Sequence, residues 1–125
     1  MALWFIMCAA TSLIPFIMIT IGLLFNKKTP EKINSFFGYR TELSMKNEET
    51  WKFAHTCFGN LMFRAGLIML PVSIAVMLFS IGQQESTIYN FTTIITLVQT
   101  LVLIILIIPV EIKLRKIFDK NGNRK

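Results

Sequence analysis

Residues 91–110 read FTTIITLVQTLVLIILIIPV and contain no charged side chain. At about 1.5 Å of rise per residue, this run is long enough to cross the hydrocarbon core of a bilayer as a helix. Residues 2–25 and 65–82 are two further uncharged, apolar runs. Because a backbone in lipid must satisfy its own hydrogen bonds, the sequence predicts an all-α membrane protein with three transmembrane helices.

The length and composition favour one domain that is embedded in the membrane. The chain has 125 residues, and 54% of them are hydrophobic, which is more than a soluble domain of this size could bury. We therefore expect a single integral membrane domain, residues 1–125. Its parts are spans at about 2–25, 57–82 and 90–111, a loop of residues 26–56, and a basic tail of residues 112–125.

The basic residues are distributed unevenly between the two sides of these spans. Of the thirteen Lys and Arg residues, six lie between residues 27 and 52 and six lie after residue 112. The connection 83–90 has none. Because cytoplasmic segments are enriched in Lys and Arg, we expect the loop and the tail to be cytoplasmic and the N-terminus to face outside a bacterial cytoplasmic membrane.

The loop itself carries helix signals. Thr29, Pro30 and Glu31 resemble a helix start, which predicts a short helix lying at the cytoplasmic membrane interface and ending by Gly38. Ser44 or Asn47 can cap a following helix that continues into the second span. Trp51 in that helix is expected at the interface belt.

The same loop contains a spaced motif that extends into the second span. Its members are Asn34, Gly38, Tyr39, Arg40, Thr41, Ser44, Trp51, His55 and Gly59. The spacing resembles that of the SdpI-type bacterial immunity membrane proteins, over roughly residues 20–82. This chain looks like a short three-span form of that family, with Tyr39 where Ile is frequent and His55 where Asn is also common.

The resemblance implies protection of a bacterium against a secreted antimicrobial peptide or toxin. It also implies an alternative, a membrane scaffold that recruits a cytoplasmic transcriptional regulator through the loop 26–56. The motif residues either lock the loop or contact a partner or lipid. Arg40, for example, can contact a lipid phosphate or the carboxylates of Glu48 and Glu49.

The second span repeats a small residue every seven positions, at Gly59, Gly66, Ser73 and Ser80. Such positions drift only about 20° per heptad, so they form one stripe along a helix. Small stripes let helices approach closely in lipid. We expect this one to contact the third span or a second copy of the chain, which would make the protein a homo-oligomer.

Polar residues also gather in the outer halves of the spans. The candidates for an outer polar pocket are Ser73, Ser80, Thr92, Thr96, Gln99 and Thr100. They either hydrogen-bond between helices or bind an extracellular peptide toxin. Gln99 stands out because its amide has four hydrogen-bonding positions, which a simple helix contact rarely satisfies.

Other classes of function find little support. The sequence has no paired carboxylates, activated nucleophile or Cys/His cluster, so we expect no enzyme, no metal site and no cofactor. Arg64 is expected to snorkel to the headgroups or to pair with Glu111. The basic tail, rather than binding nucleic acid, is expected to lie on anionic lipids and to fray at its end.

Overall fold

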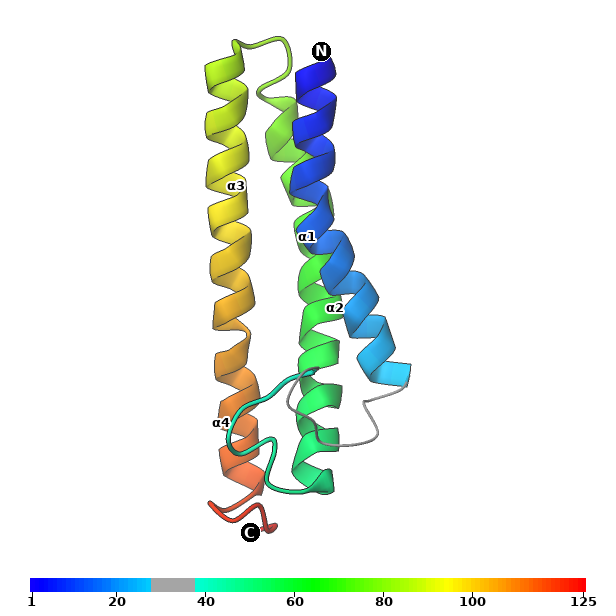
Figure 1. Ribbon diagram of the computed structural model, residues 1–125, viewed down its shortest axis with the longest axis vertical. Coiled ribbons are helices and arrows are strands. Elements are labelled where there is room, and N and C mark those ends of the chain that lie inside the picture. Colours follow the sequence, from blue (N-terminus) through cyan, green and yellow to red (C-terminus); the bar gives the residue numbers. More distant parts are fainter. Residues whose placement is uncertain (28–37) are drawn as a thin grey trace.

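The computed structural model describes residues 1–27 and 38–125, and within them the chain is helical (Figure 1). The helices are α1 (Ala2–Lys27), α2 (Glu48–Leu78), α3 (Glu85–Ile105) and α4 (Ile107–Ile117). Three stretches are long and apolar enough to cross a membrane, namely Ala2–Phe25, Glu48–Leu78 and Glu85–Ile117. The predicted all-α fold, with three helices able to span a membrane, is therefore confirmed. The short helix expected before Gly38 lies outside the described residues.

The third span is a helix with one irregular residue. Leu106 separates α3 from α4 but keeps helical angles (φ −61°, ψ −20°). Pro109 follows three residues later and has no N–H to donate to the carbonyl of Ile105, so the hydrogen-bond ladder is interrupted there. The two helices still run end to end in Figure 1.

α1 lies against α2 and bends near its middle, where Pro15 removes a backbone donor (Figure 1). The closest approach uses glycine on both helices. A Cβ atom on Gly66 would lie 2.9 Å from the carbonyl oxygen of Pro15, and one on Gly22 would lie 2.7 Å from the carbonyl oxygen of Gly59. At Gly59 and Gly66 the small stripe of α2 thus packs against α1 and not against the third span, whereas Ser73 of the same stripe does contact the third span, at Gln99.

All four stripe residues, Gly59, Gly66, Ser73 and Ser80, are buried within the single chain. An oligomer built on Gly59 and Gly66 would therefore have to displace α1. The sequence could not reveal this, because a heptad stripe identifies a face of a helix and not the neighbour that covers it.

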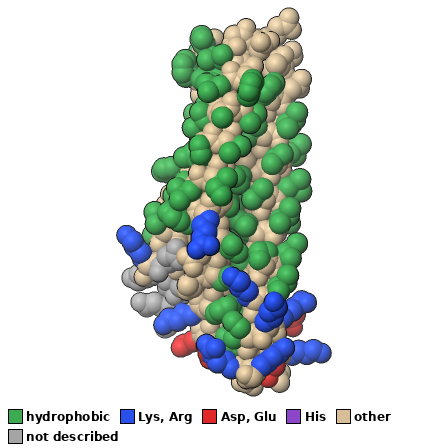
Figure 2. All heavy atoms as spheres, turned by 180° about the vertical axis from the view of Figure 1, so that it is seen from behind, with side chains coloured by type: hydrophobic (Ala, Val, Ile, Leu, Met, Phe, Trp, Pro, Cys, Tyr) green, Lys and Arg blue, Asp and Glu red, His purple; other side chains and the backbone are tan. Residues whose placement is uncertain are grey.

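The two ends of the bundle differ in charge. The N-terminus and the turn between α2 and α3 lie at one end, which we call the turn end (Figure 1). Residues 38–47, the start of α2, the end of α4 and the tail lie at the other, which we call the basic end. On the face shown in Figure 2, Lys and Arg side chains gather toward the basic end, while hydrophobic side chains are spread along the rest of the bundle.

α2 begins well before the expected span. Asn47 caps it, since its side-chain oxygen accepts from the N–H of Thr50 at 2.9 Å and the Thr50 hydroxyl accepts from the N–H of Asn47 at 3.1 Å. This reciprocal arrangement satisfies two donors at the helix start. Of the two expected caps, Asn47 is therefore the one used. The helix runs from there to Leu78 without a break.

The tail folds back onto the start of α2 instead of fraying. Phe118 and Arg124 form an isolated antiparallel bridge, and Asn47 donates its side-chain N–H to the carbonyl of Gly122 at 2.7 Å. Arg124 pairs with Glu49. We call residues 118–125 the C-terminal hook. The sequence Asp119-Lys-Asn-Gly122-Asn is a turn sequence, and its local bonds hold this end in place.

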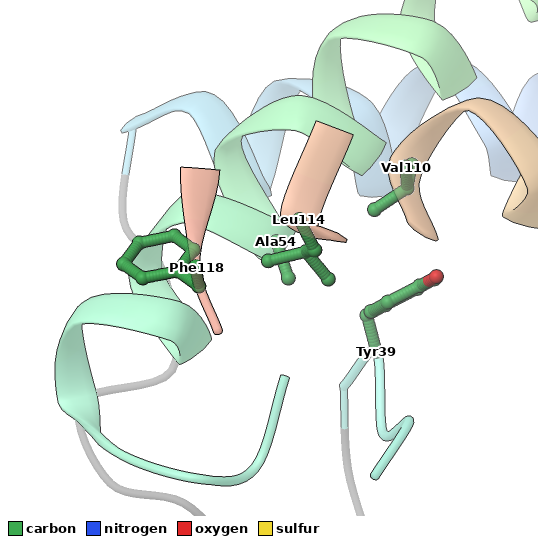
Figure 3. Packing of buried hydrophobic residues seen from close by; sticks show 5 residues of the cluster. All are labelled: Tyr39, Ala54, Val110, Leu114 and Phe118. Carbon is green, nitrogen blue, oxygen red and sulfur yellow. The ribbon is translucent and has the colours of Figure 1, made fainter. Parts of the chain in front are cut away.

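Two hydrophobic clusters stabilise the two ends. Trp4, Met77, Ile88 and Ile95 form the turn-end cluster. Tyr39, Ala54, Val110, Leu114 and Phe118 form the basic-end cluster (Figure 3). In that view, Ala54 and Leu114 lie between the rings of Phe118 and Tyr39. The loop, α2, α4 and the hook are thus packed around one shared core.

Candidate functional site

The motif begins, among the described residues, with a glycine that nothing larger could replace. Gly38 has φ +109°, a region that residues with a side chain rarely adopt. A Cβ atom there would also lie 2.4 Å from Nε2 of His55. Gly38 therefore lets the loop pass directly over the imidazole.

His55 is fully buried and fixes the next residue of the motif. Its Nε2 accepts a hydrogen bond from the backbone N–H of Tyr39 at 2.9 Å, and its Nδ1 lies 2.7 Å from the carbonyl oxygen of Trp51. Because an N–H can only donate, Nε2 must be unprotonated, and Nδ1 carries the proton donated to Trp51. His55 is therefore a neutral residue with a hydrogen bond at each ring nitrogen.

Tyr39 joins the loop to the third span. Its hydroxyl donates to Oε1 of Glu111 at 2.7 Å, and its ring packs on Phe58 with centroids 4.8 Å apart. Burial of the phenol raises the pKa of Tyr39 far above its ordinary value, and the bond to the Glu111 carboxylate raises it further. The hydroxyl therefore stays protonated and remains a donor. Glu111 has Tyr39 as its partner, while Arg64, the other partner considered, is exposed on α2.

Ser44 closes the loop on itself. Its hydroxyl accepts from the N–H of Thr41 at 2.9 Å and donates to the carbonyl of Tyr39 at 3.1 Å. The Thr50 hydroxyl then lies 3.1 Å from the carbonyl oxygen of Ser44. Both hydroxyls are buried, so these bonds satisfy groups that water cannot reach.

The remaining motif residues divide between the interior and the surface. Trp51 is buried against the ring of His55, with centroids 4.2 Å apart, and Gly59 contacts α1 at Gly22. Arg40 is exposed. Asn34 lies outside the described residues. Glu49, one of the carboxylates considered for Arg40, pairs with Arg124.

These contacts connect loop, α2 and α4 at the basic end, and they support the interpretation that the motif locks the loop. Gly38, Tyr39, Ser44, Trp51 and His55 all take part through buried contacts. A direct contact of the motif with a partner or lipid stays a prediction.

An open cleft with a volume of about 690 Å³ lies beside this lock. The loop, α4 and the C-terminal hook contribute its walls: Glu42, Leu43, Lys46, Glu111, Arg115, Phe118, Asp119, Lys120 and Lys125. The cleft was not predicted from the sequence, because the tail was expected to lie on lipid headgroups apart from the loop. The turn sequence around Gly122, where φ is +84°, was the signal that could have placed the tail.

In the turn-end half, Gln99 connects three helices. Its Nε2 donates to the carbonyl of Thr11 at 2.8 Å and to the hydroxyl of Ser73 at 2.8 Å. The side chain is only 2% exposed, and its Oε1 has no hydrogen-bond partner. The sequence correctly singled out Gln99 as an amide that its surroundings do not fully satisfy.

The other members of the expected outer pocket do not join Gln99. Ser80 accepts from the indole N–H of Trp4 at 3.1 Å, near the end of α2. The hydroxyls of Thr92 and Thr100 donate to carbonyls of their own helix, and Thr96 is half-buried. The structure therefore joins Gln99 to Ser73 by a hydrogen bond, and among the described residues no side-chain bond links Ser80, Thr92, Thr96 or Thr100 to this pair.

Trp4 is the residue at this end that sequence reasoning missed. Its indole N–H also donates to the carbonyl of Met77 at 2.8 Å, one of the last carbonyls of α2. A Trp near the end of an apolar run is a common interfacial residue, and nothing in the sequence connects it to a helix end 73 residues away.

The described residues contain no group of three or more His, Cys, Asp or Glu that could hold a metal ion. At the basic end the cleft has room for a ligand, and among the described residues Oε1 of Gln99 is a buried side-chain atom without a hydrogen-bond partner.

Comparison with known proteins gives one family and one relative. The sequence model of the SdpI/YfhL protein family matches residues 31–110, well over half of the chain. A Bacillus subtilis (strain 168) protein described as "Uncharacterized protein YfhL" is 38% identical over 53 residues. That stretch is 42% of this chain and 48% of the relative, so it spans about half the relative's length. No solved structure matches the chain significantly.

Proposed function

This chain belongs to the SdpI/YfhL family, as its loop motif predicted, and from that membership we propose that it is a membrane immunity protein. In this role it protects the bacterium that carries it from a secreted antimicrobial peptide or toxin. The observation that carries the proposal is the family match over residues 31–110, which contains the motif from Asn34 to Gly59. The family includes immunity proteins.

The proposal includes an orientation. The basic end faces the cytoplasm, and the turn end, with the N-terminus, faces outside. Its support is that twelve of the thirteen Lys and Arg residues lie in the loop, the start of α2 or the segment after residue 112. A secreted toxin then meets the turn-end half of the bundle first.

Within that half, Gln99 is the group that we propose a toxin engages. Its Oε1 is buried without a partner, and a buried carbonyl oxygen gains most from a donor that reaches it. A peptide that inserts beside the bundle carries backbone and side-chain N–H groups that can supply this donor. Thr96 lies three residues, or about one helical turn, before Gln99 in α3, and its side chain is half-buried.

The test is a toxin-challenge panel in a sensitive strain that expresses the protein. Wild type should protect against at least one secreted peptide toxin, and Gln99→Leu combined with Thr96→Val should abolish that protection at an unchanged membrane level. Thr93→Val is the matched control, because Thr93 is exposed on the same helix and bonds only to its own backbone. Full protection by the double variant would remove Gln99 from the mechanism, and a panel without any protection would remove the immunity role.

The exposed charges of the loop favour a second candidate function, a scaffold that recruits a cytoplasmic regulator. Residues 38–47 are held by the buried lock, while Arg40, Glu42 and Lys46 remain exposed on it. A rigid loop with exposed charges suits protein recognition, because little order is lost on binding. Under this alternative, Arg40→Ala releases the partner from the membrane fraction, and its retention there would contradict recruitment through Arg40.

A further inference from the structure

The cleft at the basic end has a size and position that suit a lipid headgroup. Its volume of about 690 Å³ falls in the range of small-ligand sites, roughly 300–1,000 Å³. Arg115 lines it and lies three residues after Ile112, whose side chain is 48% exposed on the apolar surface of α4. Three residues of helix rise about 4.5 Å. The cleft therefore begins within one helical turn of a surface that faces hydrocarbon.

The acidic residues of the cleft already have partners in the chain. Glu111 accepts from the Tyr39 hydroxyl, and the carboxylate of Asp119 accepts from two backbone N–H groups of the hook at 2.9 and 3.0 Å. Glu42 pairs loosely with Lys46 at 3.9 Å. Glu111 and Asp119 thus serve contacts within the loop and the hook, while Glu42 is a weak surface pair.

Three cations of the cleft have no such partner among the described residues. They are Arg115, Lys120 and Lys125, which come from α4 and the hook. The hook contributes the two lysines to the lining that the loop and α4 also form. Without the fold-back at Gly122 they would not share a cleft with the loop residues. A cluster of unpaired cations beside a membrane surface attracts the phosphate of an anionic lipid.

The lining also provides apolar surface. Leu43 and Phe118 contribute walls next to the charged groups. A phospholipid has matching groups in the same order, because its phosphate lies next to a glycerol and acyl chains. A soluble acidic protein segment could also pair with the cations. Its binding, however, would not require a cleft that lies one helical turn from the lipid-facing residues.

We propose that this cleft is a binding site for the phosphate of one anionic phospholipid, with Arg115 and Lys120 as the principal contacts. The site is distinct from the Gln99 region, and it does not depend on the immunity role. Since the loop, α4 and the hook all line the cleft, a bound lipid would hold the motif loop to the C-terminal end of the chain.

The experiment uses the full chain, purified in a non-ionic detergent, and counts bound lipids by native mass spectrometry. Short-chain phosphatidylglycerol and phosphatidylcholine are titrated separately. Wild type should retain one phosphatidylglycerol molecule per chain and markedly less phosphatidylcholine. Arg115→Gln combined with Lys120→Gln should weaken phosphatidylglycerol binding about tenfold or more, because two cations near the headgroup are lost.

The matched control is Lys113→Gln combined with Lys116→Gln. It removes the same charge from the same region, and neither residue lines the cleft. Its lipid binding should stay within about twofold of wild type. Equal weakening in both double variants, or equal retention of the two lipids, would overturn the proposal. Displacement of the lipid by inorganic phosphate or by oligoglutamate at equal concentration would overturn the assignment to a lipid.

Discussion

Gln99 supplies the hydrogen bond that Pro15 cannot donate. In a regular helix the carbonyl of Thr11 would accept from the N–H of residue 15, but proline has none. Gln99 of α3 donates its Nε2–H to that carbonyl at 2.8 Å. A carbonyl left unpaired in a membrane interior costs free energy, so the proline of one span and the glutamine of another compensate each other.

This pairing predicts non-additive stability for substitutions at the two positions. Gln99→Leu should lower the free energy of unfolding by about 1 kcal/mol, because Thr11 loses its donor. In a Pro15→Ala background, residue 15 regains an N–H for Thr11, so the cost should shrink by about 0.6 kcal/mol or more. Unfolding of the four proteins in SDS mixed micelles measures both costs, and equal costs in the two backgrounds would refute the compensation.

Gly38 should be far less replaceable than Gly82, although both have positive φ angles, +109° and +77°. A Cβ on Gly38 meets His55, whereas one on Gly82 has nothing within 4 Å. Gly82→Ala should therefore cost about 1 kcal/mol of backbone strain, and Gly38→Ala at least twice as much. Thermal unfolding in detergent compares them, and indistinguishable midpoints would show that the loop does not press on the imidazole.

The sequence predicted those helices that form because the surrounding solvent is lipid. Uncharged runs such as 91–110 must be helices in lipid, whatever the propensity of their Ile and Val residues. Asn47 was identifiable as a cap because an Asn followed by acidic residues is a local sequence signal for the start of a helix. The partner of the small stripe was not predictable, since it depends on how far α1 bends at Pro15.

The site was predictable in its composition but not in its connections. The motif gave the residues of the lock, and local turn chemistry explains Gly38 and Ser44. The contact between Tyr39 and Glu111 joins residues 72 positions apart, and no local pattern connects them. The cleft was missed for the same reason, because it exists only where the hook returns to the loop.

Tyr39 should make stability depend on pH in the alkaline range. Its pKa is raised in the folded protein, so its contribution is fully present below about pH 10, the ordinary value, and is lost as the pH rises above it. Tyr39→Phe removes that contribution, about 1 kcal/mol for the bond to Glu111. The stability difference between wild type and variant should be constant from pH 6 to about pH 9 and should shrink above pH 10.

The comparison with the phenylalanine variant removes the pH effects that the two proteins share. Thermal midpoints recorded across the pH series give the difference directly. A difference that stays constant up to pH 11 would mean that the phenol is not held protonated by its surroundings. A difference that disappears already at pH 8 would contradict the direction of the shift.

A side chain at position 66 should disrupt the contact between α1 and α2. A Cβ there lies 2.8 Å from Cγ1 of Ile19, 2.9 Å from the carbonyl oxygen of Pro15 and 3.1 Å from the backbone nitrogen of Ile19. Two of these atoms belong to the backbone of α1, so the helix itself would have to move.

Gly66→Val should therefore cost about 1–3 kcal/mol in SDS mixed-micelle unfolding, as overpacking does elsewhere. Ala75→Val, on an exposed face of α2, should change stability by less than about 0.5 kcal/mol. If both variants unfolded like wild type, the glycine face of α2 would not be the surface that α1 covers. An oligomer built on Gly59 and Gly66 would then not have to displace α1.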